Sequence, residues 1–192
     1  VALSLEGEIS NIETVNASLT STSNLIGGIV GLNSQSAILT DIQCYNCSVT
    51  SGSSDAGGIV GDNKGQIINA RVLQSNVLGS TSFIGGLAGK NSGSIYNSYA
   101  SATVKGKSFL GGLIGSNSKI LSNVFVVGKV QGLDESGTRY VGGLAGSTSS
   151  SSDISNAFAA VEVSGGTVRG GLIADGSSSD IHQRSFWDMD VS

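Results

Sequence analysis

The sequence has no proline, two cysteines, one histidine and one tryptophan among its 192 residues. Charged residues make up only 12% of the chain, and 10 Lys and Arg stand against 14 Asp and Glu, for a net charge of -4. Nucleic acid and anionic membranes bind through basic surfaces, which this composition lacks. No apolar run approaches the roughly 20 residues of a membrane span. We therefore expect neither nucleic-acid binding nor membrane insertion.

Strong helix formers are also scarce, whereas Val, Ile, Thr and Ser are abundant, which favours strands. Low charge with much Gly and Ser is typical of disordered chains, but 39% of the residues are hydrophobic and they recur regularly. The chain opens Val1-Ala2-Leu3-Ser4, with no initiator Met and no signal sequence. We expect a processed, exported all-β protein or a segment of a longer one.

A phrase of five residues, Gly-Gly-aliphatic-aliphatic-Gly, recurs along the chain. Its copies begin 30, 28, 26, 31 and 28 residues apart, at Gly27, Gly57, Gly85, Gly111, Gly142 and, with Ala in the last position, Gly170. A fixed period in this range marks repeats that bury their apolar faces by stacking on their neighbours. The chain is predicted to be an elongated stack with no central pocket.

The predicted fold is a parallel β-solenoid, or β-helix, with three short strands in each coil of about 28 residues. Six to seven coils fill a single domain over residues 1–192. The coils are expected to start near residues 7, 37, 66, 94, 120 and 153, with a partial coil over 180–192. The handedness of the coil is not predicted.

Two columns of polar residues keep their register with the glycine phrase. The first contains Asn11, Asp41, Asn69, Asn97, Asn123, Asn156 and, in the partial coil, Gln183. The second contains Asn33, Asn63, Asn91 and Asn117, followed by Thr148 and Gly176. Asn side chains stacked at strand spacing can bond one another and satisfy buried backbone groups. Both columns are predicted to be asparagine ladders at corners of the coil.

The clearest strand lies between the first ladder and the glycines, where apolar and polar residues alternate. Its inward positions are predicted at Leu19, Val49, Val77, Val104, Val130 and Val163 and two and four residues before each. The ladder residue precedes this position by eight residues in the first three coils and by seven in the last three. A bulge of one residue is therefore expected in the early coils. The glycine phrase is expected to form another apolar strand, with its glycines at positive φ or in close backbone contact.

The copies Gly85-Gly86-Leu87-Ala88-Gly89 through Asn97-Ser98-Tyr99-Ala100, together with Ser185-Phe186-Trp187-Asp188, resemble the GLUG repeat. The resemblance covers about residues 7 to 190. It implies a secreted or cell-surface protein, such as an adhesin, and supplies no catalytic motif. The first coils differ from this pattern, since Asp41 replaces Asn, and Thr14 and Cys44 are aligned with Tyr99, Phe125 and Phe158 of later coils.

No constellation of catalytic residues emerges from the sequence. Glycoside hydrolysis needs a pair of carboxylates on one face, but the acidic residues fall in different columns. His182 lacks the second His and the Glu of a zinc-peptidase motif. We expect no enzymatic activity, no cofactor and no metal site.

Cys44 and Cys47 form a Cys-x-x-Cys pair without a second pair or a βαβ context. A regular strand would point Cys47 inward and Cys44 toward the surface. Two alternatives follow: a local disulfide allowed by the bulge, or a buried Cys47 with Cys44 free to form a cross-link.

Two N-glycosylation motifs, Asn16-Ala17-Ser18 and Asn46-Cys47-Ser48, occupy equivalent outward positions of consecutive coils. Asn-x-Ser matches arise by chance in a Ser-rich chain, but the matched positions favour use of both sites in a eukaryotic secreted protein.

The predicted function is structural: an extracellular rod that assembles with copies of itself end to end, or a surface stalk. The expected end-to-end interface contains Val1, Leu3, Leu5, Phe186, Trp187 and Met189, because neither end shows a polar cap. The alternative is an adhesin that binds glycan or a host surface through Tyr99, Phe125 and Phe158. An ice-binding face is less favoured, because the outward columns are mixed.

Overall fold

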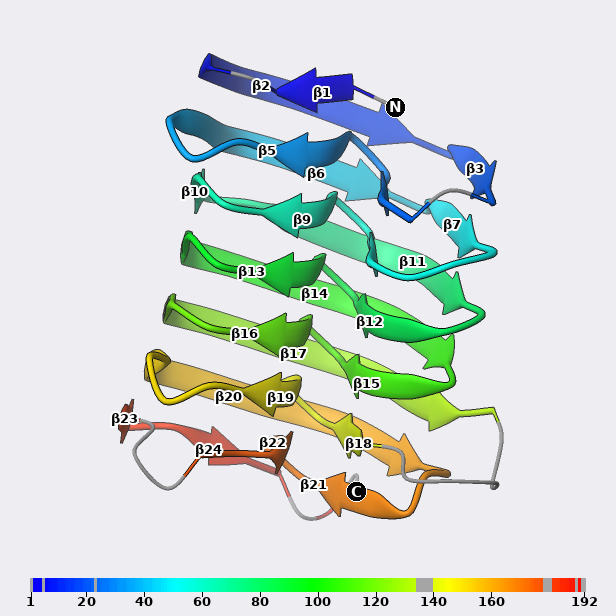
Figure 1. Cartoon of the computed structure of the whole chain (residues 1–192), viewed down its shortest axis with the longest axis vertical. Coiled ribbons are helices and arrows are strands. Elements are labelled where there is room, and N and C mark those ends of the chain that lie inside the picture. Colours follow the sequence, from blue (N-terminus) through cyan, green and yellow to red (C-terminus); the bar gives the residue numbers. More distant parts are fainter. Residues whose placement is uncertain are drawn as a thin grey trace.

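The computed structural model describes residues 2–4, 6–22, 24–133, 140–177, 181–188 and 190. These residues form strands and turns and no helix, and Figure 1 shows them wound into a stack of coils. The predicted fold is confirmed: a parallel β-solenoid of about six turns, about 28 residues apart, with three strands in each coil.

Three parallel sheets run along the stack, one for each strand of the coil. The seven-stranded sheet contains β1 (Ala2–Ser4), β5 (Val30–Asn33), β9 (Val60–Asn63), β13 (Ala88–Asn91), β16 (Ile114–Asn117), β19 (Ala145–Thr148) and β22 (Ile173–Asp175). The six-stranded sheet contains β4 (Ile26–Gly27), β8 (Ala56–Gly57), β12 (Ser82–Gly85), β15 (Ser108–Gly111), β18 (Tyr140–Gly142) and β21 (Val168–Gly170).

The third sheet, called the broad sheet below, carries the long strands of each coil. It contains β2 (Gly7–Val15), β3 (Ser18–Ser21), β6 (Ala37–Tyr45), β7 (Ser48–Ser51), β10 (Gln66–Ile68), β11 (Arg71–Gly79), β14 (Ser94–Gly106), β17 (Ile120–Gly132), β20 (Asp153–Ser164), β23 (Ile181–Gln183) and β24 (Phe186–Trp187). Coils 1 to 6 are named below from the residues at which these strands begin: Gly7, Ala37, Gln66, Ser94, Ile120 and Asp153.

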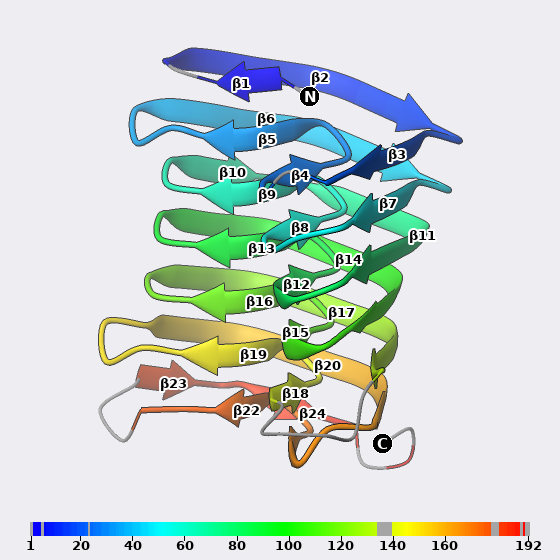
Figure 2. The same cartoon turned by 45° about the vertical axis from the view of Figure 1, so that its right-hand side comes forward.

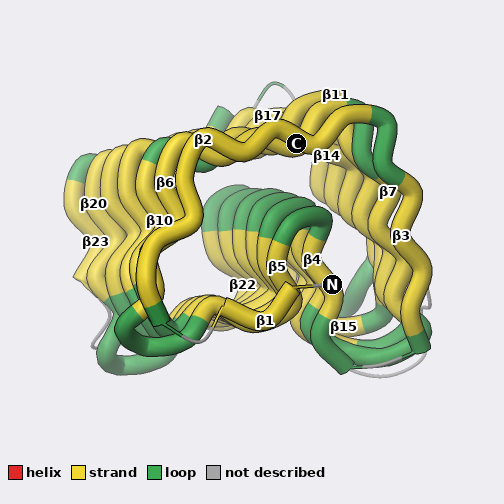
Figure 3. The backbone as a smooth tube through the Cα atoms, turned by 90° about the horizontal axis from the view of Figure 1, so that it is seen from above, coloured by secondary structure: helices red, strands yellow, loops and turns green. Residues whose placement is uncertain are grey.

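The coil is right-handed. Figure 3 looks along the stack from the end that carries β1, and the chain runs clockwise from β2 to β3 and back through β4 and β5. In Figures 1 and 2 the same path descends from one coil to the next. Right-handed crossovers between parallel strands are strongly preferred, because strands twist to the right.

The core is a set of apolar columns between the sheets. Val49, Val77, Val104 and Val130 are buried, as the alternation predicts. The prediction is wrong for Val15, Tyr45 and Leu73, because the first two of these side chains are exposed and Leu73 is only half-buried. The bulge adds one residue in coils 1 to 3 and moves the inward position to Thr14, Cys44 and Val72.

The glycine phrase is a bend and not the strand that we expected. Each strand of the six-stranded sheet ends inside a phrase, and a strand of the seven-stranded sheet begins there. In coil 2, for example, β8 ends at Gly57 and β9 begins at Val60. Figure 3 shows the segment between β4 and β5 folded into the interior of the coil. Ile59, Leu87, Leu113 and Leu144 are fully buried at its tip.

Close backbone contact, and not positive φ, explains the paired glycines of this phrase, since none of them has a positive φ. The amide of Gly86 donates to the carbonyl of Gly112 at 3.1 Å. The amide of Gly58 donates in the same way to the carbonyl of Gly86, also at 3.1 Å. A Cβ on Gly86 would collide with the carbonyl oxygen of Gly112 and lie 3.2 Å from the Cβ of Ala100. Only glycine fits where the bend packs against the broad sheet.

Gly86→Ala is therefore expected to lower the free energy of unfolding by about 1 to 3 kcal/mol or more, because the added methyl group overlaps backbone that has no room to move. Gly52→Ala is the matched control, since its nearest contact would be the Cα of Thr22 at 3.3 Å. Urea denaturation measures both variants. Equal stabilities for the two would contradict the packing described for the bend.

Candidate functional site

The second asparagine column forms a buried ladder. Asn33, Asn63, Asn91 and Asn117 are at most 1% exposed. Each Nδ2 donates to the Oδ1 of the next asparagine at 2.7 Å, from Asn33 through Asn63 and Asn91 to Asn117. The same amides also donate to backbone carbonyls, as Asn117 does to Lys119 at 2.8 Å. This column therefore satisfies the buried turn backbone, and its one unpartnered oxygen among the described residues is Oδ1 of Asn33.

The first asparagine column is a ladder on the outside of the molecule. Its side chains are exposed, apart from the half-buried Asn69. Nδ2 of Asn69 donates to Asp41 at 3.0 Å, Asn123 donates to Asn97 at 3.0 Å, and Asn156 donates to Asn123 at 2.9 Å.

Backbone conformation explains why this outer column is polar. Its members have a positive φ of 50° to 56°: Asn11, Asp41, Asn69, Asn97, Asn123 and Asn156. Asn and Asp tolerate this left-handed conformation better than other residues with a Cβ. The column bends the broad sheet, and in the last coil its member is Arg184, with φ 48°, and not Gln183, which pairs with Ser155.

The expected bulge is present and contains the two cysteines. The register of the pairing between β11 and β14 shifts between Val72 and Ser75. At the bulge, Asn16, Asn46 and Gln74 have positive φ values of 49° to 53°. Cys44 and Cys47 form a disulfide with Cα atoms 5.9 Å apart, and both are buried. Of the two alternatives, the local disulfide allowed by the bulge is present. Cys44 does not point to the surface as it would in a regular strand, because left-handed Asn46 turns the chain between the cysteines.

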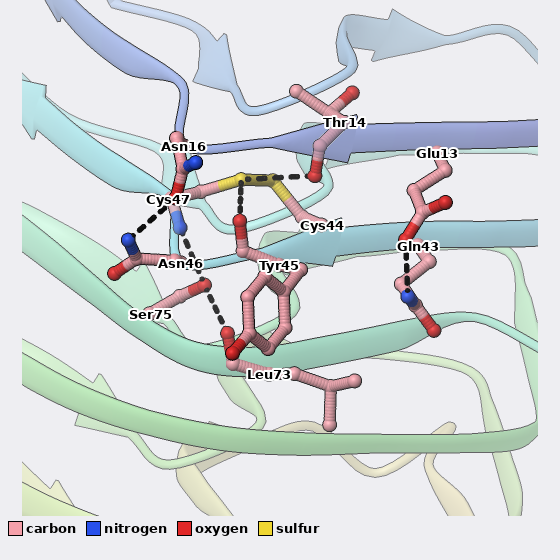
Figure 4. The surroundings of a disulfide bond; sticks show 10 residues. All are labelled: Glu13, Thr14, Asn16, Gln43, Cys44, Tyr45, Asn46, Cys47, Leu73 and Ser75. Atoms are coloured by element: carbon pink, nitrogen blue, oxygen red, sulfur yellow. Dashed lines mark hydrogen bonds between the residues drawn. A yellow bond between two sulfur atoms is a disulfide. The ribbon is translucent and has the colours of Figure 1, made fainter.

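The disulfide lies beside the two asparagines of the glycosylation motifs (Figure 4). Asn16 and Asn46 are both exposed, and Nδ2 of Asn46 donates to Oδ1 of Asn16 at 2.6 Å. The amide of Cys47 donates to the hydroxyl of Ser75 at 3.0 Å, which donates to the carbonyl of Leu73 at 2.8 Å. An amide nitrogen has two hydrogens, so the bond to Asn16 leaves one of them free on Asn46.

Aromatic residues of the later coils form an outward column on the broad sheet. Register places Tyr99, Phe125, Phe158 and Phe186 side by side. The members in the earlier coils are Glu13, Gln43 and Arg71, and not Thr14 and Cys44. The rings of Phe125 and Phe158 stack at 5.5 Å with an interplanar angle of 8°. Each of these two rings therefore has one face against the other ring.

A second aromatic column was not predicted. Phe83, Phe109 and Tyr140 are half-buried and stack with centroids 5.0 and 4.9 Å apart. Each ring stands two residues before the first glycine of a phrase, a constant offset that offers a sequence signal. Asp55 holds the same position in coil 2, with φ 58°.

Asp55 and Lys90 form an ion pair beside this second column. Nζ of Lys90 lies 3.0 Å from Oδ2 of Asp55 and 4.3 Å from the ring centroid of Phe83. Asp55 is 5% exposed, and its Oδ1 is buried without a hydrogen-bond partner. Burial raises the pKa of Asp55; Lys90 opposes this shift and the negative charge of Asp62 adds to it. No group of three or more His, Cys, Asp or Glu side chains suited to a metal occurs in the described part of the chain.

The residues expected at the two ends are only partly described. Val1, Leu5 and Met189 lie outside the described residues, and for Leu3 only its place in β1 is described. Phe186 and Trp187 are 63% and 48% exposed. Trp187 lies against Gly171 in the last coil, where it partly covers the glycine bend.

Comparison with protein families identifies the repeat, because residues 80–105 match the model of the GLUG motif. The chain carries a GLUG repeat. The match covers the end of coil 3 and the start of coil 4, and its stacked columns continue in register through the neighbouring coils. No curated protein and no solved structure matches the chain. No helix in the described parts is long and apolar enough to cross a membrane.

The two ladders predict different costs for similar substitutions. Asn91→Leu should lower the free energy of unfolding by about 1 to 3 kcal/mol for each buried partner that it leaves unpaired, including Oδ1 of Asn117. Asn97→Leu should lower the free energy of unfolding by only about 1 to 2 kcal/mol, because leucine disfavours the left-handed backbone at this position. Asn97→Gly should leave it almost unchanged, because glycine adopts this conformation readily. Chemical denaturation compares the three variants. An Asn91 variant as stable as the parent protein would contradict the buried ladder.

Proposed function

We propose that this GLUG-repeat solenoid is an extracellular structural protein, a rod that assembles end to end or forms a surface stalk. The observation that carries the proposal is the open edge at both ends of the stack. Within the described residues, each terminal strand of the seven-stranded and six-stranded sheets pairs on one side only. At one end β1 pairs with β5 and β4 pairs with β8, and at the other end β21 pairs with β18 and β22 pairs with β19. Such unpaired strand edges are templates for further strands.

The two ends are also complementary in shape. At one end the extra strand, β1, belongs to the seven-stranded sheet; at the other end the extra strands, β23 and β24, belong to the broad sheet. When a second copy is stacked below the first, its β1 follows β22 on a different face from β23 and β24. The two partial coils therefore fill different parts of one shared coil. In a longer chain, further coils would pair with the same edges, and the protein would then form a surface stalk.

The disulfide supports placement outside the cell. Disulfides persist in oxidising compartments and are rare in the cytosol. The pair in this chain is fully buried, which protects it once formed. The rod is proposed to have no catalytic role and no cofactor, and its first partner is a copy of itself.

The second candidate function is an adhesin, and the exposed outer aromatic column favours it. Phe125 and Phe158 are 38% and 37% exposed, and Phe186 is 63% exposed. Sugars stack on the faces of aromatic rings, however, and neighbouring faces in this column cover each other. A protein surface that contacts ring edges suits this column better than a glycan.

The rod should lengthen with concentration when the 192-residue chain is studied alone. Sedimentation velocity is expected to show a series of head-to-tail oligomers, and electron microscopy should show filaments of uniform width. Trp187→Arg should abolish them by placing a charge in the junction, whereas Phe125→Arg, on the side of the rod, should not. A strictly monomeric chain at high concentration would contradict end-to-end assembly.

Glycan should occupy Asn16 and Asn46 when eukaryotic cells secrete the chain. The exposed positions of both side chains leave room for the sugar, and Ser18→Ala with Ser48→Ala should remove it. Glycopeptide mass spectrometry measures both sites. Unmodified asparagine at both positions, in protein that has passed through the secretory pathway, would contradict this prediction.

A further inference from the structure

The Asp55–Lys90 pair differs from the other ion pairs of the described residues. Lys129 and Glu162 lie closer together, at 2.8 Å, but their side chains are 45% and 53% exposed. Lys64 and Asp62 are 3.7 Å apart, and Lys64 is 51% exposed. The side chain of Asp55 is only 7% exposed, that of Lys90 is 38% exposed, and the Phe83 ring covers the ammonium group. This pair is therefore short, and its carboxylate is largely removed from water.

The surroundings of Asp55 favour its neutral form. Burial disfavours charged groups, and Lys90 does not fully offset the burial of Asp55, because the pKa of Asp55 is raised. Transfer of one proton from the ammonium of Lys90 to the carboxylate gives an amine beside a carboxylic acid. These are the two reactants of amide formation.

The pair also has the geometry that the reaction needs. Near-attack separations are roughly 3 to 3.5 Å. The 3.0 Å contact between Nζ and Oδ2 holds the nitrogen of Lys90 against the carboxyl group that it would attack. The backbone of Asp55 is fixed in a bend that packs against Gly61 and Gly89. Fixed proximity of this kind reaches effective concentrations of about 10⁵ M or more, which offsets the unfavourable condensation of separate acids and amines in water.

We infer that Lys90 and Asp55 form an intramolecular isopeptide bond that joins coil 2 covalently to coil 3. The Nζ lone pair attacks Cγ of Asp55 and the Nζ–Cγ bond forms. One carboxyl oxygen leaves as water with two protons, one from the acid and one from the amine, and the other oxygen remains as the amide carbonyl. The reaction is a condensation that requires no oxidant, reductant or activated donor.

The neighbouring carboxylate that we assign to the relay of these protons is Asp62. It is the register partner of Lys90 in the adjacent strand, so the two side chains are neighbours in one outward column. Its side chain is only 14% exposed, and its charge contributes to the pKa shift of Asp55. Such a carboxylate can accept a proton from the attacking amine and return it to the departing oxygen.

This cross-link extends the proposed function without depending on it. A covalent bond between coils would strengthen a rod under tension, but it would form equally in a stalk, an adhesin or a single monomer. Failure of end-to-end assembly would therefore leave the inference standing, and absence of the bond would leave the assembly standing.

Intact-mass spectrometry of the purified 192-residue chain tests the bond. The wild type, after incubation for several days at 37 °C, is expected to weigh one water less than the disulfide-bonded sequence. Trypsin should then fail to cleave after Lys90 and should release residues 1–64 joined to residues 72–105. Cleavage after Lys129 is the internal control, because its ion pair is exposed.

Lys90→Arg is the matched variant, since it keeps the charge and the contact with Phe83 but cannot form the bond. It should fold and show the full mass. Asp62→Asn should slow the loss of water severalfold without preventing folding. A wild-type chain that keeps its full mass and is cut after Lys90 would overturn the inference, as would the same loss of water in Lys90→Arg.

Discussion

Each coil is bound to the next by backbone hydrogen bonds between equivalent positions, and the rest of the structure depends on this register. Within the paired strands, each residue faces its counterpart one coil away, at the spacing of neighbouring strands. A favourable contact in one coil is therefore repeated in the others, as in the Asn33 to Asn117 ladder. A side chain that does not fit is equally repeated, which explains why the bend requires glycine in copy after copy.

This constraint explains how much of the fold could be predicted. The glycine phrase, the two asparagine columns and the bulge all follow from counting residues, because stacking preserves spacing. Counting does not show which face a column occupies. Asn97 and Asn91 look alike in the sequence, but one is exposed at a left-handed bend and the other is buried in a turn. The same limit applies to the cysteines, because the left-handed Asn46 between them lets both side chains point toward the core.

The Asp55–Lys90 pair was beyond prediction for a different reason. Its residues come from different columns and different coils, and they are 35 positions apart in the sequence. The column of Phe83, Phe109 and Tyr140 was predictable from its constant offset from the glycines. Its contact with Lys90 was not, because that contact depends on how the two sheets meet at the corner.

The central claim is that the asparagines at the end of the β5, β9, β13 and β16 strands form a buried, hydrogen-bonded ladder that holds the coils in register. Hydrogen exchange of the side-chain amides, followed by nuclear magnetic resonance, tests it most directly. The amides of Asn63 and Asn91 should exchange orders of magnitude more slowly than those of Asn97 and Asn156, because only the former are inaccessible to water. Equally fast exchange at all four residues would contradict the account.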